Sequence, residues 1–259
     1  MTDLTDDRLD RFARHIVLPE IGGAGQARLA ASHVVLVGLG GIGSPGLQYL
    51  AGAGIGRLTL VDDDTVDLTN LQRQTIYTTR DIGHGKSVVA RNWVKAFDPA
   101  LDVTIGDARI GTGNAAALVE GADVVLDGTD NFATRLAVSD ACVKAGVPLI
   151  SAAVGRFQGQ VGAFAGHHAN QACYRCFVGD AFDADDCDTC AEDGMLGAMA
   201  GWTASFAVLQ TVRTLLADLG GMGAVAWGTV YVLDGLAPGL RDFHIVKDPA
   251  CKACGQAAS

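Results

Sequence analysis

Four cysteines in two CxxC pairs form the clearest chemical pattern in the sequence. Cys173 and Cys176 are one pair, and Cys251 and Cys254 are the other. Each pair offers two thiolates from a short turn, and four thiolates form a closed tetrahedral Zn²⁺ site. A closed site has no open position for a substrate, so these residues predict a structural zinc clip that joins the C-terminus to the body. Redox-active cysteine pairs are the alternative interpretation.

A glycine-rich loop carries the second pattern. The apolar run Val34–Val37 leads into Gly38, Gly40 and Gly43, which match GxGxxG, and an apolar helical pattern follows. Glycine lets the backbone turn tightly and approach a phosphate, at which the N-terminus of the next helix points. A second apolar run ends at Asp62, 19 residues after Gly43, where a carboxylate is expected to bind ribose hydroxyls. We expect a nucleotide here; a turn kept for packing is the alternative, and the motif does not separate ATP from NAD.

Further polar side chains follow the ends of the expected strands. The stretch after the second strand offers amide and guanidinium groups suited to phosphate or base contacts: Asn70, Arg73 and Gln74. Lys86 opens a helix, so its ammonium group is placed to stand near a triphosphate. Another apolar strand ends in Asp127 and Asp130, and a carboxylate beside phosphate oxygens suits Mg²⁺. An ordinary loop and a solvated lysine are the alternatives for these residues.

The elements that must position these groups alternate between apolar runs and helical patterns. They predict an α/β fold: a Rossmann-like mixed sheet flanked by helices. In the first half we expect strands near 34–37, 58–61, 103–105, 123–127 and 148–152, an apolar helical pattern after Gly43, and helices over 87–97, 114–119 and 132–145. The second half predicts strands at 157–165, 225–233 and 241–246, and a buried helix over 195–219. A helix over 5–15 and another over 26–31, separated by glycines, precede the sheet.

Composition and charge exclude several function classes. The 259 residues carry a formal net charge of −10, which argues against general nucleic-acid binding. No signal peptide opens the chain, and the longest apolar run, Met195–Leu209, is too interrupted and too short for a membrane span. Seven cysteines without a signal peptide indicate a cytoplasmic protein. No clear linker appears, so we expect a single domain over 1–259, with a nucleotide-binding half at 1–155 and a zinc-bearing half at 156–259.

The remaining three cysteines have different settings. Cys142 lies in an apolar helical pattern and is interpreted as an inert core thiol. Cys187 and Cys190 lie in an acidic loop, where a cysteine can act as a nucleophile. The carboxylates around them disfavour the thiolate, which weakens that interpretation.

Taken together, these motifs resemble the ThiF/MoeB/HesA family of adenylyltransferases, which are relatives of ubiquitin-activating enzymes. The resemblance covers nearly the whole chain and is strongest to the molybdopterin-synthase and thiazole-pathway branches. It rests on short segments that recur in that family: Arg11–Arg14, Gly38–Gly43, Asp62–Asp64, Thr69–Gln74, Lys86, Thr129–Asn131, and Cys173–Cys176 with Cys251 and Cys254.

The resemblance implies a set of site residues. The family pattern places an ATP site at Gly41, Asp62, Asp64, Thr69, Asn70, Leu71, Gln72, Arg73, Lys86, Asp130 and Asn131. It implies that Asp130 stands near Mg²⁺, that Arg14 reaches into the partner's site across a homodimer, and that Cys190 matches the family's loop cysteine. The catalytic set is then Arg14, Arg73, Lys86, Asp130 and Cys190.

The reaction implied is the ATP-dependent adenylylation of the C-terminal Gly-Gly carboxylate of a ubiquitin-like sulfur-carrier protein of the MoaD/ThiS type. Residues 156–259 would then bind the carrier. Some relatives carry a rhodanese domain that supplies sulfur; we expect none here and a sulfur donor on another protein. An NAD-dependent oxidoreductase and a zinc-stabilised binding protein with a dead nucleotide site are the alternatives. Dehydration of a modified tRNA base is a further possibility within the family.

Overall fold

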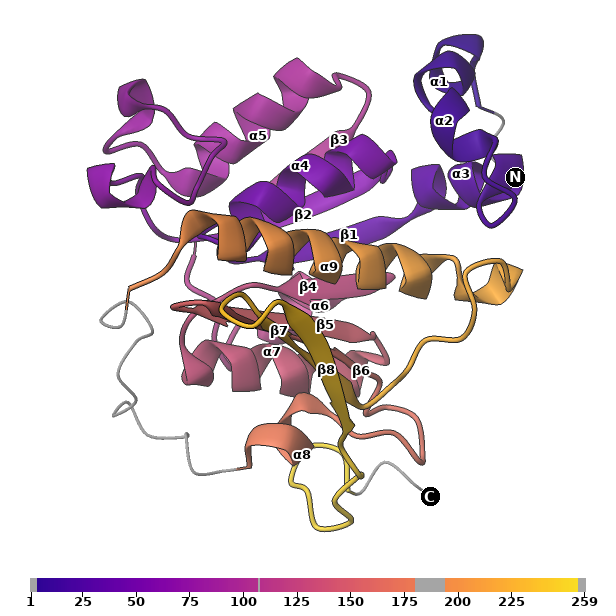
Figure 1. The fold of residues 1–259 in the computed structure, drawn as a ribbon, viewed down its shortest axis with the longest axis vertical. Coiled ribbons are helices and arrows are strands. Elements are labelled where there is room, and N and C mark those ends of the chain that lie inside the picture. The colour runs from indigo at the N-terminus through magenta and orange to yellow at the C-terminus, as the bar shows by residue number, and fades with distance from the viewer. Residues whose placement is uncertain (1–3, 107, 180–193, 256–259) are drawn as a thin grey trace.

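One mixed sheet organises the protein in this computed structural model, which describes residues 4–106, 108–179 and 194–255. Among these residues, eight strands lie in the order β3-β2-β1-β4-β5-β6-β7-β8. The first five strands are parallel to their neighbours, and β6, β7 and β8 are added antiparallel (Figure 1). The predicted fold class, a mixed α/β sheet flanked by helices, is therefore confirmed.

The parallel strands lie close to the predicted positions. They are β1 (His33–Val37), β2 (Arg57–Val61), β3 (Asp102–Gly106), β4 (Val124–Asp127) and β5 (Leu149–Gly155). Every residue of β1 is buried, because helices cover both faces of the central strand. Side chains alternate along that strand: Val34 and Leu36 join one hydrophobic cluster, and Val35 and Val37 join the other.

Helices cover the two faces of the sheet. On one face lie α4 (Gly43–Ala53), α5 (Lys86–Phe97) and α9 (Gly197–Leu215); on the other lie α6 (Ala115–Val119), α7 (Phe132–Ala145) and α8 (Tyr174–Val178) (Figure 1). The long helix α9 packs against α4 and against the strands β4, β5 and β6. It therefore joins the parallel and antiparallel parts of the sheet. Among the described residues, no helix is long and apolar enough to cross a membrane.

The antiparallel strands differ slightly from the prediction. They are β6 (Gln158–Phe164), β7 (Thr229–Asp234) and β8 (Gly239–His244). Residues 225–228 were expected to open β7 but form an irregular segment that ends in a turn, and β8 lies two residues before its expected position. The buried helix ends at Leu215, and a short 3-10 turn, η3 (Ala217–Leu219), replaces its last residues.

The N-terminal segment corrects two predictions. The helix expected over 5–15 is divided into α1 (Asp6–Arg11) and α2 (Ala13–Ile16). Phe12 separates them because its side chain is buried, 3 % exposed, and packs onto Gly54. The next helix, α3 (Gly22–Ala31), begins at the glycines rather than after them. Gly25 is needed for close packing, since a Cβ there would lie 2.9 Å from the side chain of Ile21.

Candidate active site

A cavity of about 310 Å³ opens at the carboxyl edge of the parallel strands, between the loops that follow β1, β2 and β4. Its polar and glycine lining is Gly38, Gly40, Gly41, Asp62, Asp63, Asp64, Asn70, Arg73, Gln74, Lys86, Arg109, Gly128, Thr129, Asp130, Asn131, Thr134 and Arg135. The cavity thus brings together eight of the eleven residues predicted for ATP.

The glycine loop has the backbone shape that its motif predicts. Gly38 has φ +80°, a conformation that other residues adopt only with strain. A Cβ on Gly43 would lie 1.8 Å from the carbonyl oxygen of Gly38, so the turn cannot close around a larger residue. Gly40 and Gly41 then line the cavity where α4 begins. The free N–H groups of that helix end suit a phosphate.

Asp62 is held firmly at the end of β2. The backbone N–H of Leu39 donates to its Oδ2 at 2.6 Å, and that of Asp64 donates to its Oδ1 at 2.9 Å. Burial raises the pKa of Asp62, while these hydrogen bonds and the charge of Lys86 oppose the rise. The carboxylate is therefore oriented before any ligand arrives.

Lys86 brings a buried positive charge to the cavity. Its backbone N–H bonds to the carbonyl oxygen of Asp64 at the start of α5, and its Nζ lies 2.9 Å from Asp64 Oδ2. The lysine side chain is 6 % exposed, whereas that of Asp64 is 74 % exposed. An incoming phosphate can therefore replace the exposed, solvated carboxylate as the partner of the buried ammonium group.

Arg73 lies across the glycine loop. Its Nη1 donates to the Thr69 carbonyl oxygen at 3.0 Å, and its Cδ would lie 3.4 Å from a Cβ on Gly41. The short helix η1 (Leu68–Asn70) supports this loop, and Asp67 caps it by accepting from the N–H of Thr69. Arg73 thus presents a guanidinium group where the phosphates of a nucleotide would lie.

Three of the predicted nucleotide residues are outside the cavity lining. Thr69 supplies a carbonyl oxygen to Arg73, and Leu71 packs against the hydrophobic core. The backbone of Gln72 approaches α9 so closely that a Cβ on Gly197 would lie 2.4 Å from its carbonyl oxygen. These residues support the loop that carries Asn70 and Arg73, and their contact with ATP stays a prediction.

The two carboxylates after β4 have separate roles. Asp130 is exposed and lines the cavity, as expected for a metal ligand. Asp127 is fully buried: its Oδ1 accepts hydrogen bonds from the N–H and the hydroxyl of Thr129, and its Oδ2 has no hydrogen-bond partner among the described residues. Asp127 therefore shapes the loop. Asn131 caps α7 by accepting from the N–H of Thr134 at 2.8 Å.

Two arginines that line the cavity were missed by the sequence analysis. Arg135, inside α7, donates to the carbonyl oxygens of Thr129 and of Ala152, the latter at 2.8 Å. It joins the loop after β4 to β5; its signal in the sequence was a lone arginine in an apolar helical pattern. Arg109 lines the cavity from the loop after β3, where no motif marks it.

A second cavity of about 510 Å³ adjoins the first. The two share part of their walls, namely Asp130, Arg135, Ala153 and Val154. The second cavity, which we call the β6 groove, runs over β5 and β6 and is lined by four aromatic side chains: Phe132, Phe164, Tyr174 and Phe177. An extended segment lying in this groove would have one end beside the nucleotide cavity.

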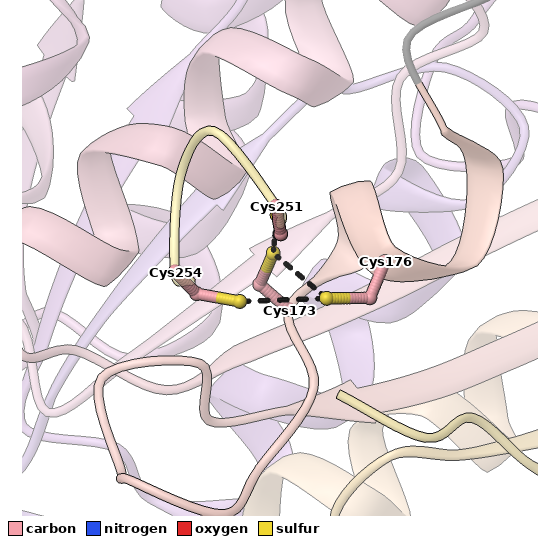
Figure 2. Close-up of side chains that lie close together, drawn as sticks. All are labelled: Cys173, Cys176, Cys251 and Cys254. Carbon is pink, nitrogen blue, oxygen red and sulfur yellow. Dashed lines mark hydrogen bonds between the residues drawn. The ribbon is translucent and has the colours of Figure 1, made fainter. Parts of the chain in front are cut away.

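The four paired cysteines meet beside α8, whose N-cap is Cys173 (Figure 2). Three sulfur pairs, Cys173–Cys176, Cys173–Cys251 and Cys176–Cys254, are 3.8, 3.6 and 3.4 Å apart, and all four sulfur atoms lie within 4.8 Å of one another. A tetrahedral zinc with Zn–S bonds of about 2.3 Å needs sulfur atoms about 3.8 Å apart. The donor set therefore fits Zn²⁺.

Arg14 and the loop cysteines do not join this cavity. Arg14 is exposed on α2, which lies at the opposite end of the molecule from the loop that carries η1 (Figure 1). Phe12 packs at Gly54, at the C-terminal end of α4, whereas the cavity lies at the N-terminal end of that helix. The eleven residues of α4 span about 16 Å, farther than an arginine side chain reaches. Cys187 and Cys190 lie outside the described residues.

Comparison with known families decides the classification. A family model described as the ThiF family matches residues 12–253. The chain belongs to the ThiF family. It is 37% identical over 256 residues to a sulfur carrier protein adenylyltransferase of Thermus thermophilus, covering 97% of this chain and 92% of the relative. A molybdopterin-synthase adenylyltransferase of Escherichia coli is 36% identical over 256 residues, covering 99% of this chain and 100% of the relative.

Solved structures agree on the fold of this ThiF-family chain. The Microcin C7 biosynthetic enzyme MccB, in complex with N-formylated MccA, aligns with a TM-score of 0.81 over 97% of this chain and 77% of that chain. The sequence identity is 20%, so the likeness establishes the fold alone.

Proposed function

We propose that this ThiF-family protein is an adenylyltransferase that uses ATP to activate the C-terminal carboxylate of a ubiquitin-like sulfur-carrier protein. The products are the carrier acyl-adenylate and pyrophosphate. The names of the Thermus thermophilus and Escherichia coli relatives support this reaction class, which requires ATP and Mg²⁺. The observation that carries the proposal is the shared wall of the two cavities, because a peptide lying in the β6 groove would have its end beside a phosphate in the first cavity.

The residues of the cavity suit a reaction that depends on placement and charge. A carboxylate oxygen of the carrier attacks the α-phosphate, and pyrophosphate leaves with the electron pair of the broken P–O bond. Because a carboxylate is a weak nucleophile, the rate comes from alignment and from neutralised charge. Arg73 and Lys86 supply positive charge, and Asp62 orients the ribose. Asp130 would hold Mg²⁺, which would neutralise further phosphate charge.

The carrier tail would lie in the β6 groove. A tail that ends in two glycines is narrow, so it can pass between aromatic walls where a bulkier end would not fit. Polar side chains of β6, Gln158 and Gln160, line the same groove and can hydrogen-bond to an extended backbone. In this arrangement residues 1–155 supply most of the nucleotide contacts, and residues 156–259 supply the groove and the cysteine site.

Zinc would occupy the four-cysteine site in a structural role. The sulfur spacing supports this proposal, and a site with four protein ligands leaves no position for a substrate. Chelation would tie the segment of Cys251 and Cys254 to α8.

Arg14 would act on the nucleotide of a second copy, which makes the protein a homodimer. The length of α4 supports this proposal, because it separates the helix that carries Arg14 from the nucleotide cavity of the same chain by more than an arginine side chain reaches. A covalent role for Cys190, a separate sulfur donor and a cytoplasmic location stay predictions. The identity of the carrier is open between the molybdopterin, thiamin and tRNA-thiolation pathways.

The deciding experiment measures two things on the same preparation. Isothermal titration compares ATP with Mg²⁺ against NAD, and exchange of labelled pyrophosphate into ATP is measured with and without a purified carrier that ends in Gly-Gly. We expect ATP to bind, NAD not to bind, and exchange to depend on the carrier. NAD binding without ATP binding favours the oxidoreductase alternative. ATP binding with no exchange for any carrier favours the catalytically dead binding protein.

A further inference from the structure

The N-terminal arm, defined as α1 and α2 (residues 6–16), is attached to the body through a buried carboxylate. Asp98 caps the C-terminal end of α5, and its side chain is 3 % exposed. Arg8 forms an ion pair with Asp98 Oδ2, and Arg11 Nε lies 3.7 Å from the same oxygen. A carboxylate at the negative end of a helix dipole is unfavourable alone. The two guanidinium groups supply the compensating charge.

Neighbouring contacts hold the same arm. Arg11 Nη2 donates to the carbonyl oxygen of Phe97 at 2.9 Å, in the last turn of α5, and its guanidinium lies 4.8 Å from the centre of the Phe97 ring. The Arg8 guanidinium lies 4.7 Å from the centre of the Phe12 ring, and Phe12 packs against Gly54 at the end of α4. The arm is thus fixed to the ends of two helices whose beginnings line the nucleotide cavity.

Arg14 is presented by this fixed arm. It lies two residues after Phe12 and is exposed, and among the described residues its side chain has no ion pair or hydrogen-bond partner. An arginine that must enter another subunit's site needs its helix held in one orientation, because a shift of about 1 Å can cost about 100-fold in rate. Asp98 provides that hold from a different part of the chain.

We propose that Asp98 is a positioning residue for Arg14, fixing the arm so that the guanidinium enters the nucleotide cavity of a second copy of the chain. The proposal rests on the proposed function, in which Arg14 acts in the partner copy. The proposal predicts an asymmetry between the two subunits. Loss of Asp98 should lower activity when it occurs in the subunit that donates the arm, and not when it occurs in the subunit whose cavity receives the arm.

Mixed dimers with two affinity tags test this direction. One subunit carries Arg14→Ala and keeps an intact cavity; the other carries Lys86→Ala and keeps an intact arm. Each mixed dimer therefore has one working combination of cavity and arm. Asp98→Asn is then added to either subunit, and carrier-dependent pyrophosphate exchange is measured together with thermal stability. Asp218→Asn is the matched control. It breaks an exposed ion pair in which Asp218 Oδ2 lies 3.7 Å from Nη2 of Arg28, on α3.

We expect Asp98→Asn in the arm-donating subunit to lower kcat about tenfold with KM for ATP unchanged, and to have no such effect in the receiving subunit. Asp98→Glu should restore part of kcat. Equal losses from both subunits would overturn the proposal, because a purely structural role acts from either side. No exchange in the parent mixed dimer, with active wild type, would instead refute the action of Arg14 in the partner. If Asp98→Asn does not fold, Arg8→Gln is used in its place. We then expect the same difference, a loss of kcat only when the substitution is in the arm-donating subunit.

Discussion

Lys86→Met removes an ammonium group from the nucleotide cavity and leaves a side chain of similar length in its place. The ion pair it breaks is short, with 2.9 Å between Nζ and Asp64 Oδ2, but the carboxylate is 74 % exposed. Water screens such a pair, so its loss changes the free energy of unfolding by less than about 1 kcal/mol. Methionine fills the space of the buried lysine stem, and no large cavity forms. We therefore expect a nearly unchanged melting temperature.

The effect of Lys86→Met on catalysis should be far larger. A fixed, poorly hydrated charge aimed at a developing phosphate charge is comparable to an oxyanion-hole donor, whose removal costs about 3 to 4 kcal/mol of transition-state stabilisation. That cost corresponds to a loss on the order of 10²- to 10³-fold in kcat. The assay is carrier-dependent exchange of labelled pyrophosphate into ATP, with melting temperatures measured in parallel.

The control for this prediction is Lys144→Met. Lys144 lies in the last turn of α7 and is exposed, so its removal changes the net charge equally without touching the cavity. We expect this variant to keep wild-type exchange. Full exchange in a well-folded Lys86→Met protein would refute the placement of the ammonium beside the phosphates. A large drop in melting temperature would show that the Asp64 pair is structural.

Three further predictions concern the other residues of the two sites. Burial raises the pKa of Asp62 above 3.8, so on acidification ATP affinity should fall in a window above that pH, and Asp62→Asn should abolish the pH dependence measured by calorimetry. Because the folded state then binds more protons than the unfolded state, this carboxylate contributes less stability as pH rises through the same window, and melting temperatures measured across that window check the sign. Asp130→Ala should lower exchange on the order of 10³-fold, whereas Asp127→Asn should act through stability; the reverse pattern would move the metal to Asp127. Cys254→Ser should lower zinc content, measured by elemental analysis, together with the melting temperature, and zinc-free wild-type protein would disprove the four-sulfur site.

Much of the parallel half could be predicted because its signals are local. An apolar run that ends at a glycine loop, as in β1, or at an aspartate, as in β2, identifies both a buried strand and the edge at which ligands bind. The position of Asp62 at the cavity follows from that topology, whereas the choice of Lys86 and Asp130 over a solvated lysine and an ordinary loop rested on the family resemblance. The same reasoning did not separate Asp127 from Asp130, since the difference is a side-chain turn in which Thr129 bonds to one carboxylate.

The features that the sequence analysis missed depend on contacts between distant segments. Phe12 divides the N-terminal helix because Gly54, 42 residues later, leaves room for its ring. Arg135 has an ordinary place in a helical pattern, and its role appears only when the carbonyl oxygens of Thr129 and Ala152 converge on it. The β6 groove likewise requires the antiparallel register of β5 and β6, in which Ala153 faces Gln160. These features appear only once separate segments are packed or paired, so a pattern within one segment does not identify them.

The cysteine site and the β6 groove are physically connected through α8. This helix has five residues, too few to be stable without tertiary contacts. Two aromatic residues of α8, Tyr174 and Phe177, line the groove, and each directly follows a cysteine of the four-cysteine site. Tyr174 packs edge-on against Phe164, with 5.7 Å between the ring centres. Fixing Cys173 and Cys176 at one metal therefore fixes the aromatic wall on which the carrier tail would lie. It follows that metal loss should raise KM for the carrier well before it changes the affinity for ATP, whose cavity shares no residue with α8.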